Sequence, residues 1–500
     1  MAGEVADTGT LPEPVLVPEP VPEPVDVLID HGVVVTMNAD REVLADGAVA
    51  IRGRRIVAVG PSADVGRRYV PATRVDASRM VVVPGMVNAH LHATTEPLTR
   101  GVVPDDTDFM ENVFAWLSPL AAAYGEGDER LAAQLGAVES LKAGTTCFLE
   151  AGTGWHLDAV VDGLLEVGVR ARVGRRIWDR PPAPEKFRQT TDQAIANLAD
   201  VLERHRSHDD GRIQGWATVV GHVTCTDDLW RAARALADEH GVGLNFHMSP
   251  MPSDPEQFLA ETGRRPVEHL DHLGVLGPDV VLVHGVYLSE GEVAILAERS
   301  CSVAHCPGTA LKVAYGVSQV GLMPEMARAG VNLCIGTDGS NACNYADMYR
   351  AAYLVAGLFK DARRDPAVFP ATEVLEMATL GGARALLADD EVGSIEPGKR
   401  ADLVLHDRDR PEWTPLHDVA NQLVYAVDGR SVHTVFVDGR TVVEDHRMTT
   451  VDEDRLYAEA QRAAEAVMGR FGRRPGPHWR TWPAQAAADG ATGRKGGRDG

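Results

Sequence analysis

The amino-acid sequence predicts an α/β fold: a TIM-like (β/α)8 barrel with a small β-sandwich domain built from both ends of the chain. Three observations predict it. Short apolar strands alternate with longer amphipathic helices from residue 84 to about residue 390, and short β segments lie on both sides of that region. No glycine-rich nucleotide-binding fingerprint is present. Its absence disfavours a doubly wound sheet, the main alternative for parallel strands.

The individual elements follow from periodicity. Amphipathic patterns predict helices over 131–143, 191–206, 229–240 and 290–299. In the same region, apolar runs predict strands over 145–149, 215–220, 243–247, 280–283, 302–305 and 332–336. Runs separated by Gly and Asp turns predict outer strands over 27–29, 33–37, 48–51, 55–59, 80–83, 402–406, 432–437 and 440–443.

These elements divide the chain into five parts. Residues 84–392 form the predicted barrel, and residues 25–83 together with 393–450 form the predicted β-sandwich. A helix is expected over 451–472. Tandem Pro-Glu-Pro-Val units predict a disordered tail over 1–24, because proline removes backbone donors and glutamate stays solvated. A composition rich in Gly, Ala, Arg and Pro predicts a second disordered tail over 473–500.

The composition excludes several classes of protein. The 500 residues contain 49 Lys+Arg and 72 Asp+Glu, a net charge of −23, so DNA, RNA and anionic membranes would repel the chain. No run of about 18 apolar residues predicts a membrane span. The 6 cysteines are too sparse for a disulfide framework, and the N-terminus lacks the features of a signal peptide. We therefore expect a cytoplasmic protein that binds neither nucleic acid nor membranes.

Histidines follow the apolar run that ends the N-terminal β region. His90 and His92 are two residues apart, so on a strand both side chains point to the same side. At the C-terminal end of a barrel strand they would point toward the active-site face. A chain with 18 histidines produces such a pair by chance, and two ordinary hydrogen-bonded histidines are the alternative interpretation.

Three further polar residues also stand at the end of an apolar run, and this repetition favours a metal site. His247, His284 and Asp338 each end a buried apolar run. Burying these polar groups together is costly unless they are paired or bind a metal. Imidazoles with one carboxylate suit zinc or ferrous iron. His222 and His305 also follow strands, and each is interpreted either as a substrate contact or as a structural histidine.

A family resemblance rests on motifs spread over residues 26–446. The segment Val82-Val-Pro-Gly-Met-Val-Asn-Ala-His90-Leu-His92 resembles the first-strand motif of the amidohydrolase superfamily. Five further motifs follow in the family's order: Gly144-Thr-Thr-Cys-Phe, Val283-His284-Gly-Val-Tyr-Leu-Ser, His305-Cys-Pro-Gly-Thr-Ala-Leu-Lys312, Gly336-Thr-Asp338-Gly, and Gly393-Ser-Ile-Glu-Pro-Gly-Lys-Arg-Ala-Asp-Leu-Val. The sequence is most similar to the branch of S-adenosylhomocysteine/methylthioadenosine deaminases, guanine-type deaminases and triazine chlorohydrolases.

The resemblance implies one divalent metal ion, zinc with ferrous iron as the alternative, held by four ligands: His90, His92, His247 and Asp338. Asp338 would also accept the proton of the attacking water and deliver it to the leaving group. His284 would contact that water or the substrate. The implied substrate contacts are completed by His222, His305 and Asn344.

One departure from the family pattern affects the substrate side. Deaminases of this branch carry a glutamate three residues after the ligand equivalent to His247, where it moves a proton to a ring nitrogen. In this chain the position is Pro250, which has no proton to give. Residues 342 and 343, after the final aspartate, also differ from the usual Ser and Asn.

The leading hypothesis is a metal-dependent hydrolase that attacks a C–N bond of a nitrogen-containing, heterocyclic small molecule, in the manner of a deaminase. Pro250 keeps a second hypothesis open, hydrolysis of a cyclic amide, amide or amidine, or dechlorination. A non-catalytic metal-binding barrel is the third. The resemblance also implies a homo-oligomer, such as a dimer, and a small molecule as the binding partner.

Overall fold

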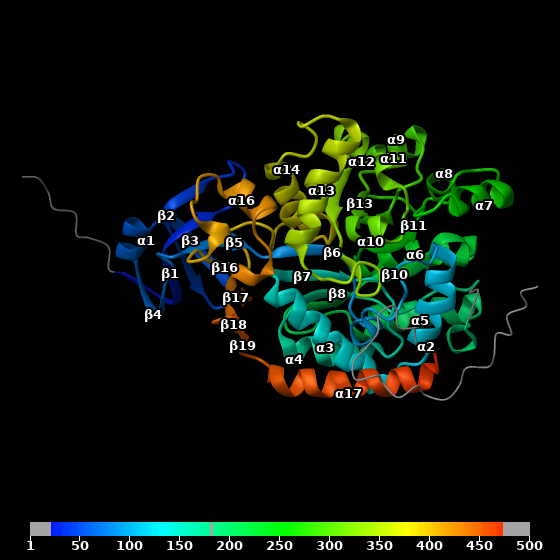
Figure 1. The fold of residues 1–500 in the computed structure, drawn as a ribbon, viewed down its shortest axis with the longest axis horizontal. Helices are drawn as coiled ribbons and strands as arrows, with labels where there is room; N and C mark the ends of the chain where they lie inside the picture. The colour runs from blue at the N-terminus through cyan, green and yellow to red at the C-terminus, as the bar shows by residue number, and fades with distance from the viewer. Residues whose placement is uncertain (1–21, 181–183, 474–500) are drawn as a thin grey trace, which may run out of the picture.

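The computed structural model describes residues 22–180 and 184–473, which contain one large mixed sheet and two parallel sheets. Figure 1 shows the large sheet at one end of the molecule and the parallel strands, wrapped by helices, at the other. The predicted mixture of helices and parallel strands is confirmed. Among the helices of the described residues, none has the length and apolar character needed to cross a membrane.

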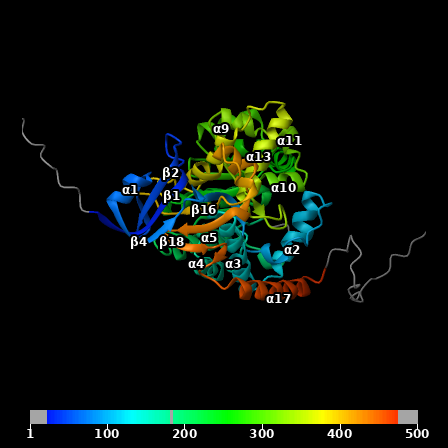
Figure 2. The same ribbon diagram turned by 60° about the vertical axis from the view of Figure 1, so that its left-hand side comes forward.

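Both ends of the chain contribute to one nine-stranded sheet with the order β19-β18-β17-β16-β5-β1-β2-β3, in which β4 also pairs with β1. β16 pairs antiparallel with β5, and β5 runs parallel to β1, so these pairings join the two ends of the chain. Figure 2 shows the blue and orange strands side by side. The strands are β1 (Glu23–Val35), β2 (Val43–Arg52), β3 (Arg55–Pro61), β4 (Tyr69–Asp76), β5 (Met80–Pro84), β16 (Leu403–Asp407), β17 (Val432–Val437), β18 (Arg440–Glu444) and β19 (Arg447–Met448).

Two details differ from the sequence prediction. The nine strands form one continuous hydrogen-bonded sheet where two sheets of a sandwich were expected, because β5 bonds to strands from both ends. Strand β1 begins inside the predicted N-terminal tail, since Glu23 pairs with Tyr69 and Pro24 with Val70 of β4. The other residues of that tail, 1–21, and residues 474–500 of the C-terminal tail lie outside the described residues.

The strands predicted for the barrel lie in two five-stranded parallel sheets, ordered β15-β6-β7-β8-β9 and β10-β11-β12-β13-β14. Backbone hydrogen bonds also cross between them, from Trp216 N–H to the Val173 carbonyl and from Val220 N–H to the Ile177 carbonyl. The strands are β6 (Met86–His92), β7 (Thr145–Glu150), β8 (Arg170–Val173), β9 (Ile213–Gly215), β10 (Ala217–Gly221), β11 (Leu244–Met248), β12 (Val280–His284), β13 (Ser302–His305), β14 (Asn332–Ile335) and β15 (Asp338–Gly339).

Helices alternate with these strands and begin at capping residues. Thr190 accepts a hydrogen bond from Gln193 N–H at the start of α5, and Ser289 accepts one from Glu292 N–H at the start of α9. The helices of this region are α2 (Ser118–Ala122), α3 (Glu126–Lys142), α4 (Leu157–Val167), α5 (Thr191–Arg204), α6 (Asp227–His240), α7 (Ser253–Thr262), α8 (Pro266–His272), α9 (Glu290–Glu298), α10 (Pro307–Lys312), α11 (Val317–Val320), α12 (Met323–Arg328), α13 (Met348–Arg363), α14 (Ala371–Glu376) and α15 (Gly382–Ala385).

Three helices lie outside this alternation: α1 (Ser62–Arg68) and α16 (Val419–Tyr425) flank the strands of the large sheet, and α17 (Glu453–Phe471) follows its last strand. Helix α17 lies within the range predicted for a C-terminal helix. It packs along α3, where Ala460 and Val467 share a buried apolar cluster with Ala132 and Tyr124. Figure 1 shows it in red beneath α3 and α4.

A buried ion-pair network joins the large sheet to the parallel strands. Arg170 of β8 is fully buried and donates to both carboxylate oxygens of Asp402, over 2.8 and 3.0 Å. It also donates to Asp438, in the turn between β17 and β18. Although burial lowers the pKa of Arg170, the two carboxylates raise it well above the usual value, so the guanidinium stays charged.

We expect Arg170→Met to destabilise the fold strongly, because it leaves the buried carboxylate of Asp402 without its cation, whereas Asp438 keeps Arg54 and Arg400 as partners. Removing one member of a buried ion pair costs about 3–5 kcal/mol. Denaturant unfolding measures the change. Arg67→Met is the matched control: Arg67 pairs with Asp64 on the exposed surface, and its loss should change stability by about 0.5 kcal/mol or less. Equal effects of the two substitutions would contradict the prediction.

Candidate metal centre and active site

The two histidines of β6 point to the same side, as expected for residues two apart on a strand. His90 is fully buried, and its Nε2 lies 3.1 Å from Nε2 of His92. The Oδ1 atom of Asp338 lies 3.0 Å from Nε2 of His92 and 3.5 Å from Nε2 of His90. Asp338 reaches them because its strand, β15, pairs with β6.

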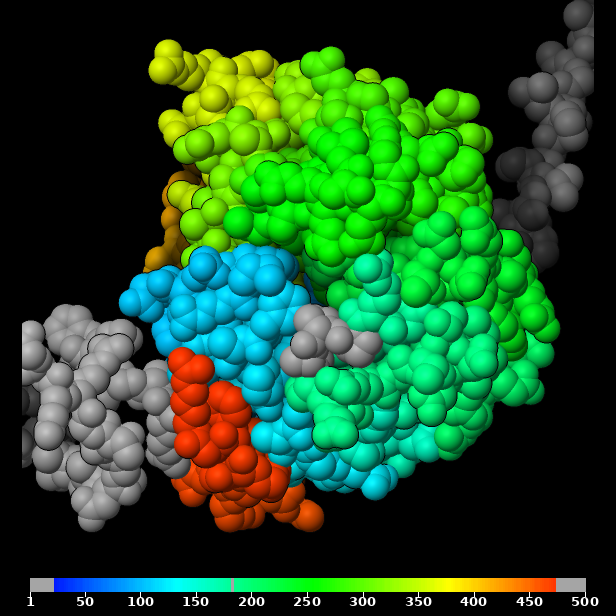
Figure 3. Space-filling model, turned by 90° about the vertical axis from the view of Figure 1, so that its right-hand side faces the viewer, coloured from blue at the N-terminus to red at the C-terminus, as the bar shows by residue number. Residues whose placement is uncertain are grey.

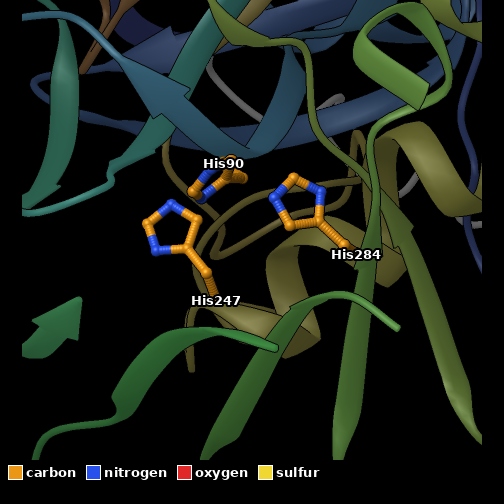
Figure 4. Close-up of side chains that lie close together, drawn as sticks. All are labelled: His90, His247 and His284. Carbon is orange, nitrogen blue, oxygen red and sulfur yellow. The ribbon is translucent and has the colours of Figure 1, made fainter. Parts of the chain in front are cut away.

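Two further imidazoles complete the cluster from β11 and β12. Nε2 of His247 lies 3.4 Å from Nε2 of His92. Nε2 of His284 lies 4.0 Å from Oδ2 of Asp338. One nitrogen from each of His90, His247 and His284 lies within 4.8 Å of the other two. Figure 4 shows these three rings turned toward one another from separate strands. The fold therefore brings together all five residues that the sequence analysis selected for metal chemistry.

The spacing of the donors fits a single metal ion. Ligands bonded to zinc at about 2.0–2.1 Å lie roughly 3 Å or more apart. Four of the distances joining His90, His92, His247 and Asp338 are 3.0, 3.1, 3.4 and 3.5 Å. A divalent metal such as zinc fits this donor set.

The charges of the site favour metal binding. Burial lowers the pKa of His90, brings that of His284 to about 3 and takes that of His247 well below its usual value, so these rings are neutral. Burial raises the pKa of Asp338, but hydrogen bonds from His90 and His92 outweigh it and keep the carboxylate ionised. Neutral imidazoles with one carboxylate are the forms that bind zinc.

The ring of His92 differs because it faces two carboxylates. Burial lowers its pKa, but the hydrogen bond and charge of Asp338, with the charge of Glu96, raise it to about 9. Nδ1 of His92 lies 3.3 Å from Oε1 of Glu96, and Nδ1 of His247 lies 2.8 Å from the carbonyl oxygen of Val220. These partners fix both rings with Nε2 toward the cluster, as outer partners do in metal sites.

Three residues of the site have a left-handed backbone conformation. His222, His284 and Asp338 have φ angles of 52°, 75° and 70°, in the left-handed region that non-glycine residues seldom adopt. Such conformations cost free energy and persist where the surrounding structure enforces them, often at functional sites. Here they turn side chains at strand ends toward the cluster.

A cavity of about 400 Å³ opens beside the metal ligands. Figure 3 views the molecule from the side on which a recess separates the blue-to-cyan segment from green loops. The segment from Phe109 to Ser118, which includes a π-helix (Glu111–Leu117), forms one wall. Besides the metal cluster and Glu96, the lining residues include Phe109, Met110, Val113, Phe114, Leu117, Arg176, Trp178, Val220, His222, Val223, Asp254, Gln257, Val313 and Tyr315. The lining is mostly apolar, with a few polar groups, which is typical of a small-molecule site.

His222 lines this cavity, and its ring stacks on His247 with the ring centres 5.7 Å apart. Its Nδ1 lies 2.6 Å from Oδ2 of Asp254. Pro250, where the family pattern has glutamate, is buried. The carboxylate nearest along the chain that reaches the cavity is therefore Asp254 of α7.

Two predicted substrate contacts lie elsewhere. His305 ends β13, but its ring packs against Phe359 of α13, 5.8 Å between ring centres, and it is not among the residues that line the cavity. Asn344 lines a separate open groove, and its side chain accepts a hydrogen bond from Lys312. The structure thus brings His222 and His284 to the cavity, but neither His305 nor Asn344.

Arg176 is a cavity residue that sequence reasoning missed. It is 7% exposed, and its guanidinium donates over 3.3 Å to the carbonyl of Thr153 and lies over the rings of Phe187 and Trp178. Burial lowers its pKa to about 10. Within the described residues, no carboxylate lies within ion-pair distance of it. The only signal in the sequence was an arginine placed soon after a short strand.

Comparison with known protein families shows which family this chain belongs to. The model described as "Amidohydrolase family" matches residues 81–442. This chain belongs to the amidohydrolase family. A second model, an imidazolonepropionase-like composite domain of bacteria, matches residues 47–69, within the large sheet. The resemblance stated from sequence motifs is therefore confirmed.

Relatives in the amidohydrolase family share most of its length. The chain is 33% identical over 445 residues to a 5-methylthioadenosine/S-adenosylhomocysteine deaminase of Pelotomaculum thermopropionicum, covering 89% of this chain and 99% of that one. It is 30% identical over 451 residues to a 5'-deoxyadenosine deaminase of Methanosarcina acetivorans, with coverage of 89% and 99%.

Solved structures of the family share the fold. An adenosine deaminase from Xanthomonas campestris with bound zinc superposes with a TM-score of 0.84 at 34% identity, covering 90% of this chain and 100% of that one. An atrazine chlorohydrolase from Arthrobacter aurescens complexed with zinc gives a TM-score of 0.81 at 23% identity, with coverage of 88% and 100%. This amidohydrolase is a metal-dependent, deaminase-like hydrolase of C–N bonds other than peptide bonds.

Proposed function

We propose that the protein removes the amino group from the heterocycle of an adenosine-like nucleoside, with one zinc ion held by His90, His92, His247 and Asp338. The observation that carries the proposal is the convergence of these four donors, with distances of 3.0–3.5 Å between neighbours, beside a cavity of about 400 Å³. That volume suits a small molecule such as a nucleoside. Relatives at 30–35% identity named as deaminases of adenosine derivatives support the substrate class.

Each residue of the site has a separate role in hydrolysis. A divalent ion held there supplies a hydroxide-like nucleophile at neutral pH, because it lowers the pKa of water. Asp338, kept ionised by its histidine partners, accepts the proton and returns it to the departing amine. Neutral His284, across from Asp338, accepts or donates a hydrogen bond to orient the attacking water or the substrate.

The part of the substrate that lies away from the metal contacts a different set of residues. Arg176 presents N–H donors to the cavity and suits an acceptor oxygen or an anionic group of the substrate. Phe109, Val113 and Phe114 suit the flat face of a ring or an apolar substituent. His222 is a polar group of the cavity whose ring stacks on that of His247.

Ammonia release from a panel of compounds tests the proposal. The zinc-loaded protein is incubated with adenosine, 5'-deoxyadenosine, methylthioadenosine, S-adenosylhomocysteine, guanine, a chlorotriazine and a cyclic amide. We expect ammonia from one or more of the adenosine derivatives and the fastest turnover among them. Ring opening of the cyclic amide or chloride release, without ammonia from any nucleoside, would overturn the proposal.

Pro250 favours a second candidate, hydrolysis of a cyclic amide, amide or amidine, or dechlorination, because these reactions need no protonation of an aromatic ring nitrogen. We expect Pro250→Glu to raise kcat/KM for adenosine deamination, by about 10-fold or more, if proton delivery limits that reaction. Pro250→Gln, of matched size but without an acid, is the control. A deaminase whose rate falls equally in both variants would show that residue 250 has no place in proton delivery.

We further infer that the two parallel sheets form one closed (β/α)8-type barrel. The backbone hydrogen bonds from Trp216 to Val173 and from Val220 to Ile177 support closure on one side, and the direct succession of β14 and β15 supports it on the other. The nine-stranded sheet occupies the place in the chain where the β-sandwich domain was predicted. A homodimer and a cytoplasmic location remain proposals that rest on the family resemblance and on the six free cysteines.

A further inference from the structure

Asp254 is a buried carboxylate that connects two loops of the candidate active site. Its side chain is 4% exposed, and its Oδ2 atom accepts two hydrogen bonds. One comes from Nδ1 of His222 over 2.6 Å, and the other from the backbone N–H of Ser249 over 2.8 Å. Ser249 follows β11, two residues after the metal ligand His247.

The local backbone makes this contact possible. Strands β10 and β11 are neighbours, and Gly221 pairs with His247. A Cβ atom on Gly221, whose φ is 88°, would lie 2.2 Å from the carbonyl oxygen of His247, so only glycine allows the strands to approach this closely. His222 then leaves the strand with a φ of 52° and turns its ring between His247 and Asp254.

The hydrogen bond to Asp254 determines which ring nitrogen of His222 carries the hydrogen. Oδ2 of Asp254 already accepts from Ser249 N–H, so it faces Nδ1 with a lone pair and Nδ1 donates. In the Nδ1–H tautomer the other ring nitrogen is an acceptor. Nε2 lies on the opposite side of the ring from Asp254, and the ring of His222 lines the cavity. A substrate in the cavity therefore faces a hydrogen-bond acceptor, Nε2 of His222.

We propose that Asp254 is a positioning residue that holds His222 as the Nδ1–H tautomer, so that Nε2 selects substrates with an N–H or O–H group there. This inference rests on the proposed function, because it names a feature of the substrate of the same site. A ribose hydroxyl or a ring N–H satisfies the requirement. A ring nitrogen that offers only a lone pair would face the lone pair of Nε2 and bind weakly.

The proposal is tested first without turnover, in zinc-loaded protein labelled with ¹⁵N-histidine. Imidazole ¹⁵N shifts separate the two tautomers, and the signal missing from the His222→Gln spectrum identifies His222. We expect the Nδ1–H form in the wild type. Asp254→Leu removes the acceptor for Nδ1, so we expect that variant to lose the preference for the Nδ1–H form. Asp254→Asn can keep its amide oxygen where Ser249 and His222 both donate, so we expect it to retain that preference. An Nε2–H form in the wild type, or an unchanged Nδ1–H preference in Asp254→Leu, would overturn the proposal.

Kinetics then test the role of the acceptor. We expect Asp254→Leu to raise KM about 10- to 100-fold with a smaller change in kcat and unchanged zinc content, because Nε2 is then no longer held as an acceptor for the substrate. His222→Gln keeps an acceptor oxygen and should retain more affinity than His222→Leu. Equal KM values in the two His222 variants, or an Asp254→Leu variant that only loses zinc or thermal stability, would overturn the proposal.

A control separates this role from a merely structural one. Asp179 also bridges two loops, because its carboxylate accepts hydrogen bonds from Thr226 and Thr191, but it does not line the cavity. We expect Asp179→Asn to leave KM and the His222 signal unchanged. A protein with the expected tautomer but no ammonia release would refute the proposed function alone, so the two failures are distinguishable.

Discussion

Asp338→Asn is expected to lower kcat/KM by about 10³-fold or more, while the protein still folds. The substitution removes the carboxylate that is proposed both to bind the metal and to accept the proton of the attacking water, and proton transfer by a positioned group is worth about 10²–10⁴-fold. Its Oδ1 atom lies 3.0 Å from His92 and 3.5 Å from His90, so no other carboxylate in the described residues is as well placed. Steady-state kinetics of ammonia release measure the effect.

Two measurements complete that experiment. Zinc content shows how much of the loss comes from weaker metal binding, and a thermal melt shows that the fold persists. Asp228→Asn is the control, because Asp228 lies exposed in the first turn of α6. Turnover by Asp338→Asn within a few fold of the wild type would rule out its role as proton acceptor.

Removal of the metal is expected to abolish turnover and to lower stability. The purified protein should contain about one zinc equivalent per chain, because the donors converge on one position. At free zinc about 1,000-fold above Kd, bound metal adds about 4 kcal/mol to the free energy of unfolding. A chelator should therefore lower Tm along with activity, and added Zn²⁺ should restore both.

The choice of ion provides the control. Mg²⁺ prefers oxygen ligands and octahedral geometry, so it should not replace zinc among three imidazoles and one carboxylate. Fe²⁺ restoring more activity than Zn²⁺ would identify iron as the native ion. A metal-free preparation that retains full turnover would refute the metal-dependent mechanism.

Much of the fold could be predicted because local patterns agree with tertiary contacts. The helix predicted over 229–240 is α6 (Asp227–His240), and the strand predicted over 280–283 is β12 (Val280–His284). Helix α6 begins two residues earlier than predicted because Thr226 caps its start, and it ends at the predicted residue, before Gly241 in the left-handed region. Pairing between distant strands has no local signal, and so the single nine-stranded sheet was not predicted.

The candidate site could also be predicted only in part from the sequence. His90 and His92 could be assigned to one side because strand periodicity fixes their relation. His284 and His305 both end strands of the same sheet, yet His284 faces the metal cluster and His305 packs against Phe359 of α13. A shift of one residue along a strand reverses the face to which a side chain points, and sequence does not fix that position at a strand end.

The sequence by itself determined the family, the alternation of strands and helices, and the His and Asp residues of the metal cluster, because these depend on residue types at fixed local spacings. Only the tertiary structure decided what surrounds the substrate. Asp254 reaches His222, 32 positions away along the chain, and Arg176 enters the cavity from the segment that follows β8. These contacts depend on how strands β8, β10 and β11 lie against one another. Long-range packing sets that arrangement, and the residues of any one segment do not encode it.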